Sequence, residues 1–479
     1  MSSTLPNEVS GARIEPRVEI GAIVEKARAA QRAIENYTQE QVDALVLAVG
    51  WSVVKNREAL ARFAVDEGGF GNYESKVMKI RNRVIGTIRD MQGQRTVGVV
   101  EELPERGIVK IAKPVGVIAA LIPTTGPDAT PPVKALAALK GRNSIIVAPH
   151  PRTWQTTAMA VELMRKGCVQ VGAPADLIQI VDRPSIAKTS ELMKQADLVV
   201  ATGGESMVKA AYSSGTPAFG VGVGNSVHVV DETADLDDAA AMIARAKTFD
   251  FATSCLADNA VVADESIYGS LMEKLIARGG HLLSATEKAR LEAVMWPQPD
   301  QHIPSLDVIA KSAQHIAQLA GIALPEGKSF LMVEETGVGP SHPFSGEKLS
   351  VVLTVYRYSA CKIEHAIELV NAITGYQGLG HTCGIHTTND AHIQALAMRT
   401  RTARVLVNQD LNEGAGSPRN GMPYTLSLSC GTWGGNITTE NVNVRHFLNL
   451  TWVSRLVDPK AMPISDEALF AGHWASHGK

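Results

Sequence analysis

The stretch VIAALIPTTGPDATPPVKALAALKGRNSIIVAPHPRT, residues 117–153, decides the fold. It begins with a short apolar run and passes through a polar turn into a segment with prolines near its start and apolar residues at helical spacing. It ends in a second apolar run, SIIVA (144–148). Short apolar runs between turns are typical of strands that are buried on both faces, and proline is typical of the first turn of a helix. The stretch therefore predicts one strand–helix–strand unit of a parallel sheet.

The same alternation continues to about residue 230. The apolar runs DLIQIV, DLVVAT and AFGVGV are separated by the helical segments IAKTSELMKQ and SMVKAAYSSG. Because crossovers between parallel strands are right-handed, helices cover both faces of such a sheet, and a ligand crevice forms at the carboxyl ends of its strands. We therefore expect an α/β protein with a doubly wound parallel sheet.

The remaining segments suggest three parts. Residues 17–93 have helical periodicity, RTVGVVEELPERGIVKIAKP reads as a β-hairpin, and a second alternation of helices and strands starts near residue 236. The text after 436 includes a run that we interpret as a strand returning to the hairpin. The predicted parts are a first α/β unit (1–93 and 114–235), a hairpin with the tail (94–113 and 436–479) and a second α/β unit (236–435).

Composition excludes several classes of protein. The chain has 479 residues, which is too many for one compact core and predicts at least two domains. The formal net charge is −3, so no basic surface points to nucleic acid. The apolar stretches are far too short to cross a bilayer, and the start, MSSTLPNEVSGARIEP, lacks the apolar core of a signal peptide. We expect a cytoplasmic protein that binds neither nucleic acid nor membrane.

A pair of glycines follows one predicted strand of the first unit. In VVATGGESMVKAAYSSG (199–215), Gly203 and Gly204 stand between the strand and the next helix. Glycine allows close approach of the backbone to a ligand, and the helix N-terminus presents unpaired N–H groups to a phosphate. Because the pattern is not G-x-G-x-x-G, it does not distinguish a nucleotide-binding turn from a plain tight turn between strand and helix.

Polar residues follow two other strands of the same sheet. Thr124 and Thr125 come after the first strand of the quoted stretch, and His150 and Arg152 come after the second. All four are expected on the ligand face of the sheet. The planar guanidinium of Arg152 could bind a phosphate, and a solvated loop arginine is the alternative.

One of the five cysteines stands apart. The five are widely spaced without a C-x-x-C pair, so we expect neither a disulfide framework nor a metal site. Cys255 lies in KTFDFATSCLADNAVVADESI (247–267), in a turn between a predicted helix and a predicted strand, next to the small residues Thr253 and Ser254. Because the thiolate is the reactive form of cysteine, an accessible loop thiol of this kind is a candidate nucleophile. The alternative is a buried loop thiol.

Together these segments resemble the aldehyde dehydrogenase superfamily. They are most similar to its CoA-acylating branch, which includes the aldehyde dehydrogenase half of bifunctional aldehyde–alcohol dehydrogenases. The resemblance spans nearly the whole chain and is carried by KPVGVIAALIPTTGPDAT, SIIVAPHPR, ATGGESMVKAAYSSGTPAFGVGVGN, VVDETADL, KTFDFATSC, HPFSGEKLS and SLSCGTWGGN. It implies that the first unit binds a dinucleotide, that the second is catalytic, and that the hairpin with the tail joins subunits into a homodimer or homotetramer. The alcohol dehydrogenase half is absent, so we expect a stand-alone enzyme.

The resemblance also implies roles for individual residues. Cys255 would add to an aldehyde and, after hydride transfer to nicotinamide, carry the acyl group as a thioester. The Cys255 N–H and the Thr125 hydroxyl, at a position where hydrolytic relatives have asparagine, would stabilise the aldehyde oxygen. Glu347, in SGEKLS, would hold the nicotinamide ribose, and Gly203 and Gly204 would lie beside the nicotinamide and the pyrophosphate.

Two departures from the family pattern refine the expected reaction. The family's adenosine-ribose lysine is replaced by Ala148, so Arg152 becomes a candidate for binding a 2′-phosphate, which favours NADP over NAD. Hydrolytic relatives carry a general-base glutamate in a segment that here reads GVGVGNSVHVV (220–230) and contains no carboxylate. Without that base water is poorly activated, whereas CoA thiolate needs less help. We expect transfer to CoA, and we interpret His228 in this segment as structural.

The aldehyde is suggested by one loop. The loop before SLSCGTWGGN, which lines the family's substrate funnel, reads NEGAGSPRNGMPYT here and contains Arg419. A sulfonate would suit such a cation, and the basic loop is similar to that of acylating sulfoacetaldehyde dehydrogenases. Three alternatives stay open: a CoA-acylating enzyme for acetaldehyde or another short aldehyde, a hydrolytic aldehyde dehydrogenase, and a catalytically inactive nucleotide-binding scaffold.

Overall fold

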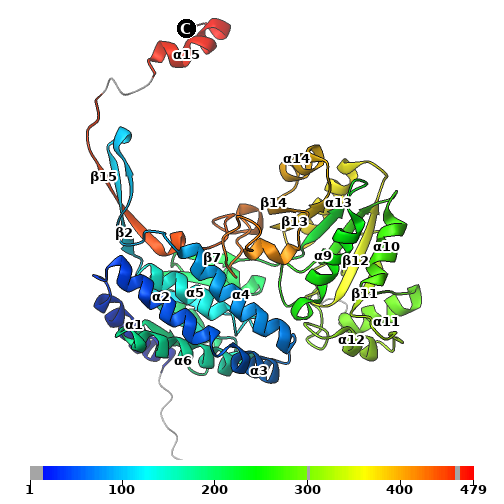
Figure 1. The fold of residues 1–479 in the computed structure, drawn as a ribbon, viewed down its shortest axis with the longest axis horizontal. Helices are drawn as coiled ribbons and strands as arrows, with labels where there is room; N and C mark the ends of the chain where they lie inside the picture. The colour runs from blue at the N-terminus through cyan, green and yellow to red at the C-terminus, as the bar shows by residue number, and fades with distance from the viewer. Residues whose placement is uncertain (1–14, 299–301, 459–463, 479) are drawn as a thin grey trace, which may run out of the picture.

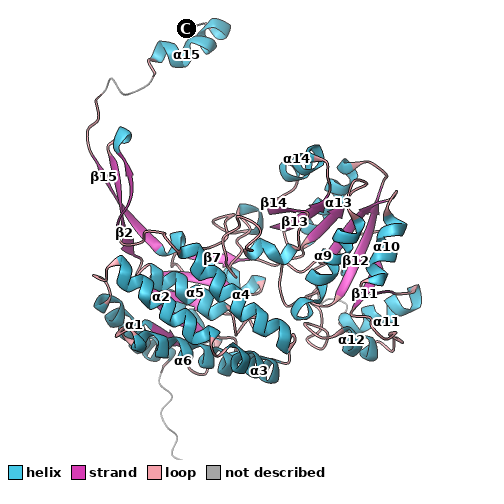
Figure 2. Ribbon diagram, viewed as in Figure 1, coloured by secondary structure: helices cyan, strands magenta, loops and turns pink. Residues whose placement is uncertain are grey.

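Three β-sheets organise the molecule in the computed structural model, which describes residues 15–298, 302–458 and 464–478 (Figure 1). A five-stranded and a seven-stranded sheet form the centres of two bodies, and a three-stranded sheet projects from the first body (Figure 2). Residues 1–14, 459–463 and 479, which we assigned to the first unit and the tail, lie outside the described residues, and so does most of the start that we read as lacking a signal peptide.

Four helices occupy residues 16–91, in agreement with the predicted helical periodicity. They are α1 (Pro16–Ala33), α2 (Gln39–Val54), α3 (Arg57–Gly68) and α4 (Tyr73–Met91). Side chains cap two of them: Thr38 and Gln41 form a capping box at the start of α2, and Asn72 accepts a hydrogen bond from the Ser75 N–H at the start of α4. The next helices of this body are α5 (Thr130–Lys140), α6 (Trp154–Gln170), α7 (Ile186–Gln195) and α8 (Glu205–Tyr212).

The five-stranded sheet is parallel and covered on both faces. Its strands, in spatial order, are β5 (Ile178–Ile180), β4 (Ser144–Ala148), β3 (Val117–Leu121), β6 (Leu198–Thr202) and β7 (Ala218–Val221). Alternate residues face opposite layers: Ile118 and Ala120 pack with α2, α4, α5 and α6, whereas Val117 and Ala119 pack with α1, α7 and α8. Burial on both faces explains the continuous apolar runs in the sequence. The predicted doubly wound sheet is confirmed.

The second body is built on the seven-stranded parallel sheet. Its strands, in spatial order, are β10 (Gly280–Leu282), β11 (Phe330–Glu334), β12 (Val352–Tyr358), β9 (Ala260–Asp264), β8 (Val227–Val230), β13 (Gly380–His386) and β14 (Thr402–Val407). Its helices are α9 (Leu236–Thr248), α10 (Tyr268–Ala277), α11 (Ala285–Met295), α12 (Ala313–Leu319), α13 (Ile363–Tyr376) and α14 (Asp390–Arg399). Strand β8 pairs here, although its residues fall within 114–235. The division into domains stays a prediction.

The predicted hairpin is present and projects from the first body (Figure 1). β1 (Gly98–Leu103) and β2 (Ile108–Pro114) are antiparallel, and β15 (Leu448–Ser454) returns to pair antiparallel with β2. Leu450 and Trp452 on β15 are exposed. Helix α15 (Asp466–His477) lies beyond the tip of this sheet in the view of Figure 1.

Short 3-10 turns connect several of these elements. They comprise Pro104–Arg106, Pro151–Thr153, Ala175–Leu177, Phe249–Ala252, Pro343–Ser345, Leu411–Ala415, Thr432–Gly434 and Val444–Phe447. Among the described residues, no helix combines the length and the apolar character needed to cross a bilayer.

Candidate active site

A cavity of about 480 Å³ lies where the carboxyl ends of β3, β4 and β6 meet loops of the second body. It brings together seven of the residues predicted from the sequence. They are Thr124, Thr125, His150, Gly203, Gly204, Cys255 and Glu347. Arg152 and Arg419 are not among its lining residues. Residues as far apart in the chain as Thr124 and Glu347 thus share one cavity, which places the carboxyl ends of parallel strands next to a thiol.

Cys255 is held by a strained turn after α9. Asp250, Phe251 and Ala252 have φ values of 49°, 50° and 60°, which residues with a side chain rarely adopt. The buried Asp250 carboxylate fixes this turn: it accepts hydrogen bonds from Lys79 Nζ at 2.6 Å, from Thr253 Oγ1 at 2.9 Å and from the Asn72 N–H at 3.0 Å. The ion pair between α4 and this turn therefore holds the two bodies together next to Cys255.

Cys255 Sγ lies 3.2 Å from Nε2 of His381, at the start of β13. Burial raises the pKa of the Cys255 thiol well above its usual value, and the nearby Glu347 carboxylate adds to this shift. Burial, together with the Arg404 guanidinium, lowers the pKa of His381 to about 3. His381 Nδ1 is buried without a hydrogen-bond partner. At neutral pH the pair is therefore a neutral thiol beside a neutral imidazole.

Glu347 lies next to Cys255 across Gly224. The Gly224 N–H donates to Glu347 Oε1 at 2.8 Å, and Glu347's own N–H donates to Gln377 Oε1 at 2.8 Å. Burial raises the pKa of Glu347 to about 7. A Cβ at position 224 would lie 2.5 Å from Glu347 Oε1 and 2.7 Å from Cys255 Cβ, so only glycine lets the Glu347 carboxylate and Cys255 approach this closely.

The nucleotide side of the cavity presents backbone and hydroxyl groups. Gly204 is the N-cap of α8 without a side-chain cap, and a Cβ built there would meet nothing within 4 Å. Thr124 Oγ1 is buried without a hydrogen-bond partner. His150 Nδ1 accepts a hydrogen bond from the Arg152 N–H at 3.2 Å. An open helix start and an unpaired hydroxyl fit the pyrophosphate and ribose of a dinucleotide.

The two predicted arginines lie apart from the cavity lining. The Arg152 guanidinium stacks over the Phe70 ring, 4.7 Å from its centroid. Arg419 forms an ion pair with Glu413, and its side chain is 56% exposed. Each guanidinium thus already has a partner outside the cavity.

His228 has the surroundings of a structural residue. It is fully buried on β8, its Nδ1 lies 2.7 Å from Asp258 Oδ1, and its ring stacks on His386 with centroids 4.3 Å apart. Burial lowers the pKa of His228 to about 3. The segment 220–230 brings no carboxylate to Cys255, and Glu347 is the carboxylate that lines the cavity among the described residues.

Sequence reasoning did not identify His381, Lys79 or Arg83 as lining or contacting this site. His381 is the second residue of the strand GHTCGIH, which reads as an ordinary buried strand. Lys79 and Arg83 lie in the charged helix segment KIRNR, which reads as a solvated face, yet both line the cavity. The signal for His381 in the sequence was a histidine at the start of a predicted strand, where its side chain can face a neighbouring loop.

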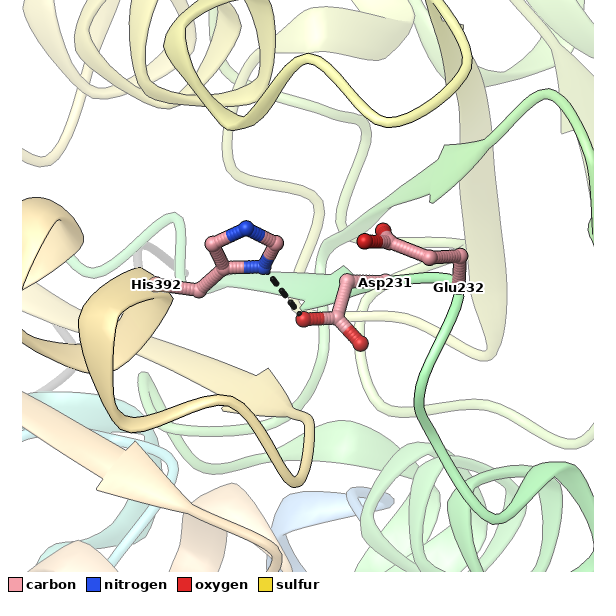
Figure 3. Close-up of side chains that lie close together, drawn as sticks. All are labelled: Asp231, Glu232 and His392. Carbon is pink, nitrogen blue, oxygen red and sulfur yellow. Dashed lines mark hydrogen bonds and ion pairs between the residues drawn. The ribbon is translucent and has the colours of Figure 1, made fainter.

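A second cluster of possible ligand groups lies at the ends of β8 and β13. Asp231, Glu232 and His392 can each place one ligand atom within 4.8 Å of the others (Figure 3). Asp231 is already saturated, because Oδ1 accepts from the N–H and hydroxyl of Thr233, and Oδ2 accepts from Thr387 Oγ1 and lies 2.7 Å from His392 Nδ1. We interpret the cluster as a set of hydrogen bonds that joins the segment after β8 to the segment after β13.

Comparison with known proteins gives a consistent result. Residues 9–302 match the aldehyde dehydrogenase family. The chain is 46% identical over 455 residues to a sulfoacetaldehyde dehydrogenase of Acholeplasma sp, covering 94% of this chain and 93% of the relative. It is 45% identical over 463 residues to the sulfoacetaldehyde dehydrogenase (acylating) of Bilophila wadsworthia, covering 95% and 98%.

Solved structures agree with these relatives. An acetylating aldehyde dehydrogenase from Geobacillus thermoglucosidasius superposes with a TM-score of 0.90 at 36% identity, over 95% of this chain and 100% of that one. A Rhodopseudomonas palustris propionaldehyde dehydrogenase with bound CoA and an acylated cysteine gives 0.82 at 27%, over 91% and 97%. An engineered glycolyl-CoA reductase with bound NADP+ gives 0.82 at 26%, over 91% and 96%.

Proposed function

Since this chain belongs to the aldehyde dehydrogenase family, we propose that it oxidises sulfoacetaldehyde with NAD(P)+ and CoA to the sulfoacetyl-CoA thioester. The observation that carries the proposal is the pairing of Cys255 with His381 in a cavity where the segment 220–230 supplies no base for water. The names of the relatives at 45–46% identity support the aldehyde and the acylating outcome.

In this proposal His381 and Cys255 act as base and nucleophile. The Cys255 thiol gives its proton to His381 Nε2, 3.2 Å away, as its sulfur bonds to the aldehyde carbon. The negative charge then develops on the substrate oxygen, where the Cys255 N–H and the Thr125 hydroxyl are the candidate donors. Thr125 lines the cavity, as this role requires.

The second half-reaction releases the acyl group. When bound, the nicotinamide cofactor accepts the hydride, which leaves the acyl group on Cys255 as a thioester. His381 first releases the proton taken from Cys255 to solvent, so that Nε2 can accept another. The CoA thiol then adds to the thioester carbon as its proton passes to His381 Nε2, and Cys255 leaves as a thiolate that regains this proton from His381.

The residues proposed to bind the cofactor share the nucleotide side of the cavity. Gly203 and Gly204 would contact the pyrophosphate, and Thr124 and His150 would line the part of the cavity that holds the dinucleotide. Glu347 would accept hydrogen bonds from the ribose hydroxyls. We keep NADP as the favoured form on the basis of Arg152, which is exposed and would have to leave Phe70 to meet a 2′-phosphate. No metal ion enters the proposed reaction.

Hydrolysis of the thioester is the second candidate, and one observation favours it. Glu347 lies near Cys255, and its pKa of about 7 suits a general base for water. Its Oε1 is occupied by the Gly224 N–H, which holds the carboxylate in place rather than leaving it free to swing toward water.

A burst experiment separates the two candidates. Enzyme is mixed with sulfoacetaldehyde and either NAD+ or NADP+, first without CoA, and NAD(P)H is followed by its absorbance. We expect one equivalent of NAD(P)H per active site, then no further turnover until CoA is added. Steady turnover without CoA would establish hydrolysis. Absence of any burst with sulfoacetaldehyde, but a burst with acetaldehyde, would move the assignment to a short-chain acylating enzyme.

We also propose that the enzyme acts in the cytoplasm as a homodimer or homotetramer joined through the β1–β2–β15 sheet. The exposed Trp452 and Leu450 on β15 would be covered by a partner. Light scattering should give a mass at least twice that of the chain, and a Trp452→Glu variant should lower it. A monomer at micromolar concentration would contradict the proposal.

A further inference from the structure

One cation of the cavity is not used by the chemistry above. Two lysine or arginine side chains line the cavity among the described residues, Lys79 and Arg83 on α4. Lys79 is neutralised by Asp250 at 2.6 Å and Asp128 at 3.6 Å. Arg83 makes no ion pair in the described part of the chain. Its partly buried positive charge therefore has no directly bonded counter-ion among these residues, although the Asp410 and Glu413 carboxylates are near enough to act on it.

The Arg83 guanidinium is held in a fixed orientation by carbonyl groups alone. Its Nη1 donates to the carbonyls of Ala415 at 2.8 Å and Gly416 at 2.9 Å, and its Nη2 donates to the Asn412 carbonyl at 2.9 Å. These bonds leave the Nε–H and one Nη2–H without an acceptor among the described residues. A rigid guanidinium with two unused donors is the arrangement that binds a three-oxygen anion through paired hydrogen bonds.

The position of Arg83 suits a short anionic substrate. Ala415, which accepts a hydrogen bond from Arg83, packs with Val221, Leu256 and Leu428 in the hydrophobic cluster against which Cys255 lies. The cation therefore borders the apolar wall around the nucleophile. In sulfoacetaldehyde a single methylene separates the anionic sulfonate from the aldehyde carbon. A cation that binds the sulfonate must therefore lie close to the thiol that attacks the aldehyde carbon.

We propose that Arg83 binds the sulfonate and sets the preference of the enzyme for an anionic aldehyde. This inference rests on the proposed function and replaces Arg419 as the anion anchor. Arg419 is committed to Glu413 and largely exposed, whereas Arg83 lines the cavity and has no carboxylate partner among the described residues. Glu413 also lies 3.9 Å from Arg245, so the Arg419 pair belongs to a surface network.

The test compares kcat/KM for sulfoacetaldehyde and acetaldehyde in wild type, Arg83→Met and Arg83→Lys. The matched control is Arg81→Met, an exposed arginine two residues away on the same helix. We expect the sulfoacetaldehyde-to-acetaldehyde ratio to fall about 10-fold to 100-fold in Arg83→Met, to fall less in Arg83→Lys, and to stay unchanged in Arg81→Met. Added guanidinium should partly restore the ratio in Arg83→Met.

A second measurement separates this inference from the proposed function. Isethionate, an unreactive sulfonate, is tested as a competitive inhibitor of acetaldehyde oxidation, and its inhibition constant should rise at least tenfold in Arg83→Met. If wild type oxidises sulfoacetaldehyde but the ratio is unchanged in Arg83→Met, the function stands and the inference is wrong. If wild type does not oxidise it, the function is wrong, and equal isethionate inhibition of both proteins overturns the inference as well. Loss of both substrates in Arg83→Met and Arg83→Lys would mean that Arg83 only supports the loop.

Discussion

Cys255 Sγ and His381 Nε2 lie 3.2 Å apart, and both groups are uncharged at neutral pH. Burial raises the pKa of the thiol and lowers the pKa of the imidazole to about 3, so the proton stays on sulfur. In the proposed reaction this pair would transfer its proton as the sulfur attacks the aldehyde carbonyl.

The first prediction concerns the reactivity of the free thiol. Because only the thiolate reacts and the pKa of Cys255 is raised above its usual value, the rate of alkylation by iodoacetamide should still increase at pH 9. The rate is measured from pH 6 to pH 9.5 by mass spectrometry, with Cys255→Ser to identify the modified residue. A plateau below pH 8 would show a low thiol pKa and contradict the prediction.

The second prediction concerns His381. His381→Asn keeps a polar side chain but removes the base, so the acylation burst should slow by about 10²-fold to 10⁴-fold. Rapid-mixing measurement of NAD(P)H at several pH values checks this, and the burst rate of the variant should rise more steeply with pH than that of wild type. His386→Asn is the control, because His386 is buried next to His228 rather than next to Cys255. A burst rate equal to wild type would remove His381 from the reaction.

The large elements of the fold were predictable because both faces of the strands are buried. Runs such as VIAAL and SIIVA fit a central parallel strand, and Thr124, Thr125 and His150, which follow them, line the cavity at the predicted edge of the sheet. Strand β8 was harder to place because VHVV would be equally buried in either sheet. Its sheet is decided by pairing with β9 and β13, which lie far along the chain.

The site was only partly predictable, for a similar reason. Cys255 stands in a turn whose local sequence is informative, whereas His381 becomes informative only when β13 is placed beside that turn. Arg83 reads as one charge in a charged helix face, and Arg419 reads as a free cation in a loop. The ion pair between Arg419 and Glu413 and the position of Arg83 at the cavity are the observations on which we propose Arg83 instead of Arg419 as the anion-binding residue.

The third prediction concerns Gly224. In Gly224→Ala the new Cβ would lie 2.4 Å from the Cys255 carbonyl oxygen and 2.5 Å from Glu347 Oε1. Either the nucleophile or the carboxylate must move, so kcat should fall at least about 100-fold. Gly204→Ala is the matched control for size, since its Cβ meets nothing within 4 Å; it should raise KM for the cofactor and leave the burst amplitude intact. Normal kcat in Gly224→Ala would show that the contact relaxes freely.

The fourth prediction concerns the pH dependence of stability. The pKa of Glu347 is raised from an ordinary 4.5 to about 7, so the folded protein binds this proton more tightly than the unfolded chain. The stabilisation from protonated Glu347 is therefore present at acid pH and is lost as pH rises through 7. The side chain in Glu347→Gln cannot titrate. The melting temperature of this variant relative to that of wild type should therefore rise between pH 5 and pH 8. A constant difference between the two proteins across this range would refute the shift.

The fifth prediction concerns the buried ion pair next to the turn that leads to Cys255. Asp250 is buried and bonded to Lys79 and Lys76, at 2.6 Å and 3.3 Å. Asp250→Asn leaves the buried Lys76 ammonium and the largely buried Lys79 ammonium with one fewer counter-charge, which should destabilise the fold by about 3–5 kcal/mol. The loss should be visible as a lower urea midpoint in equilibrium unfolding.

The matched control for this pair is Asp237→Asn. Asp237 forms an ion pair with Lys274 at 2.7 Å, but its side chain is 70% exposed, so the midpoint should stay within error of wild type. Asp250→Asn should also slow the acylation burst, because the strained turn at 250–252 loses its anchor and Cys255 its position. An Asp250→Asn protein with unchanged midpoint and unchanged burst would mean that the positive-φ turn is held by packing alone, and that the ion pair between the two bodies is dispensable.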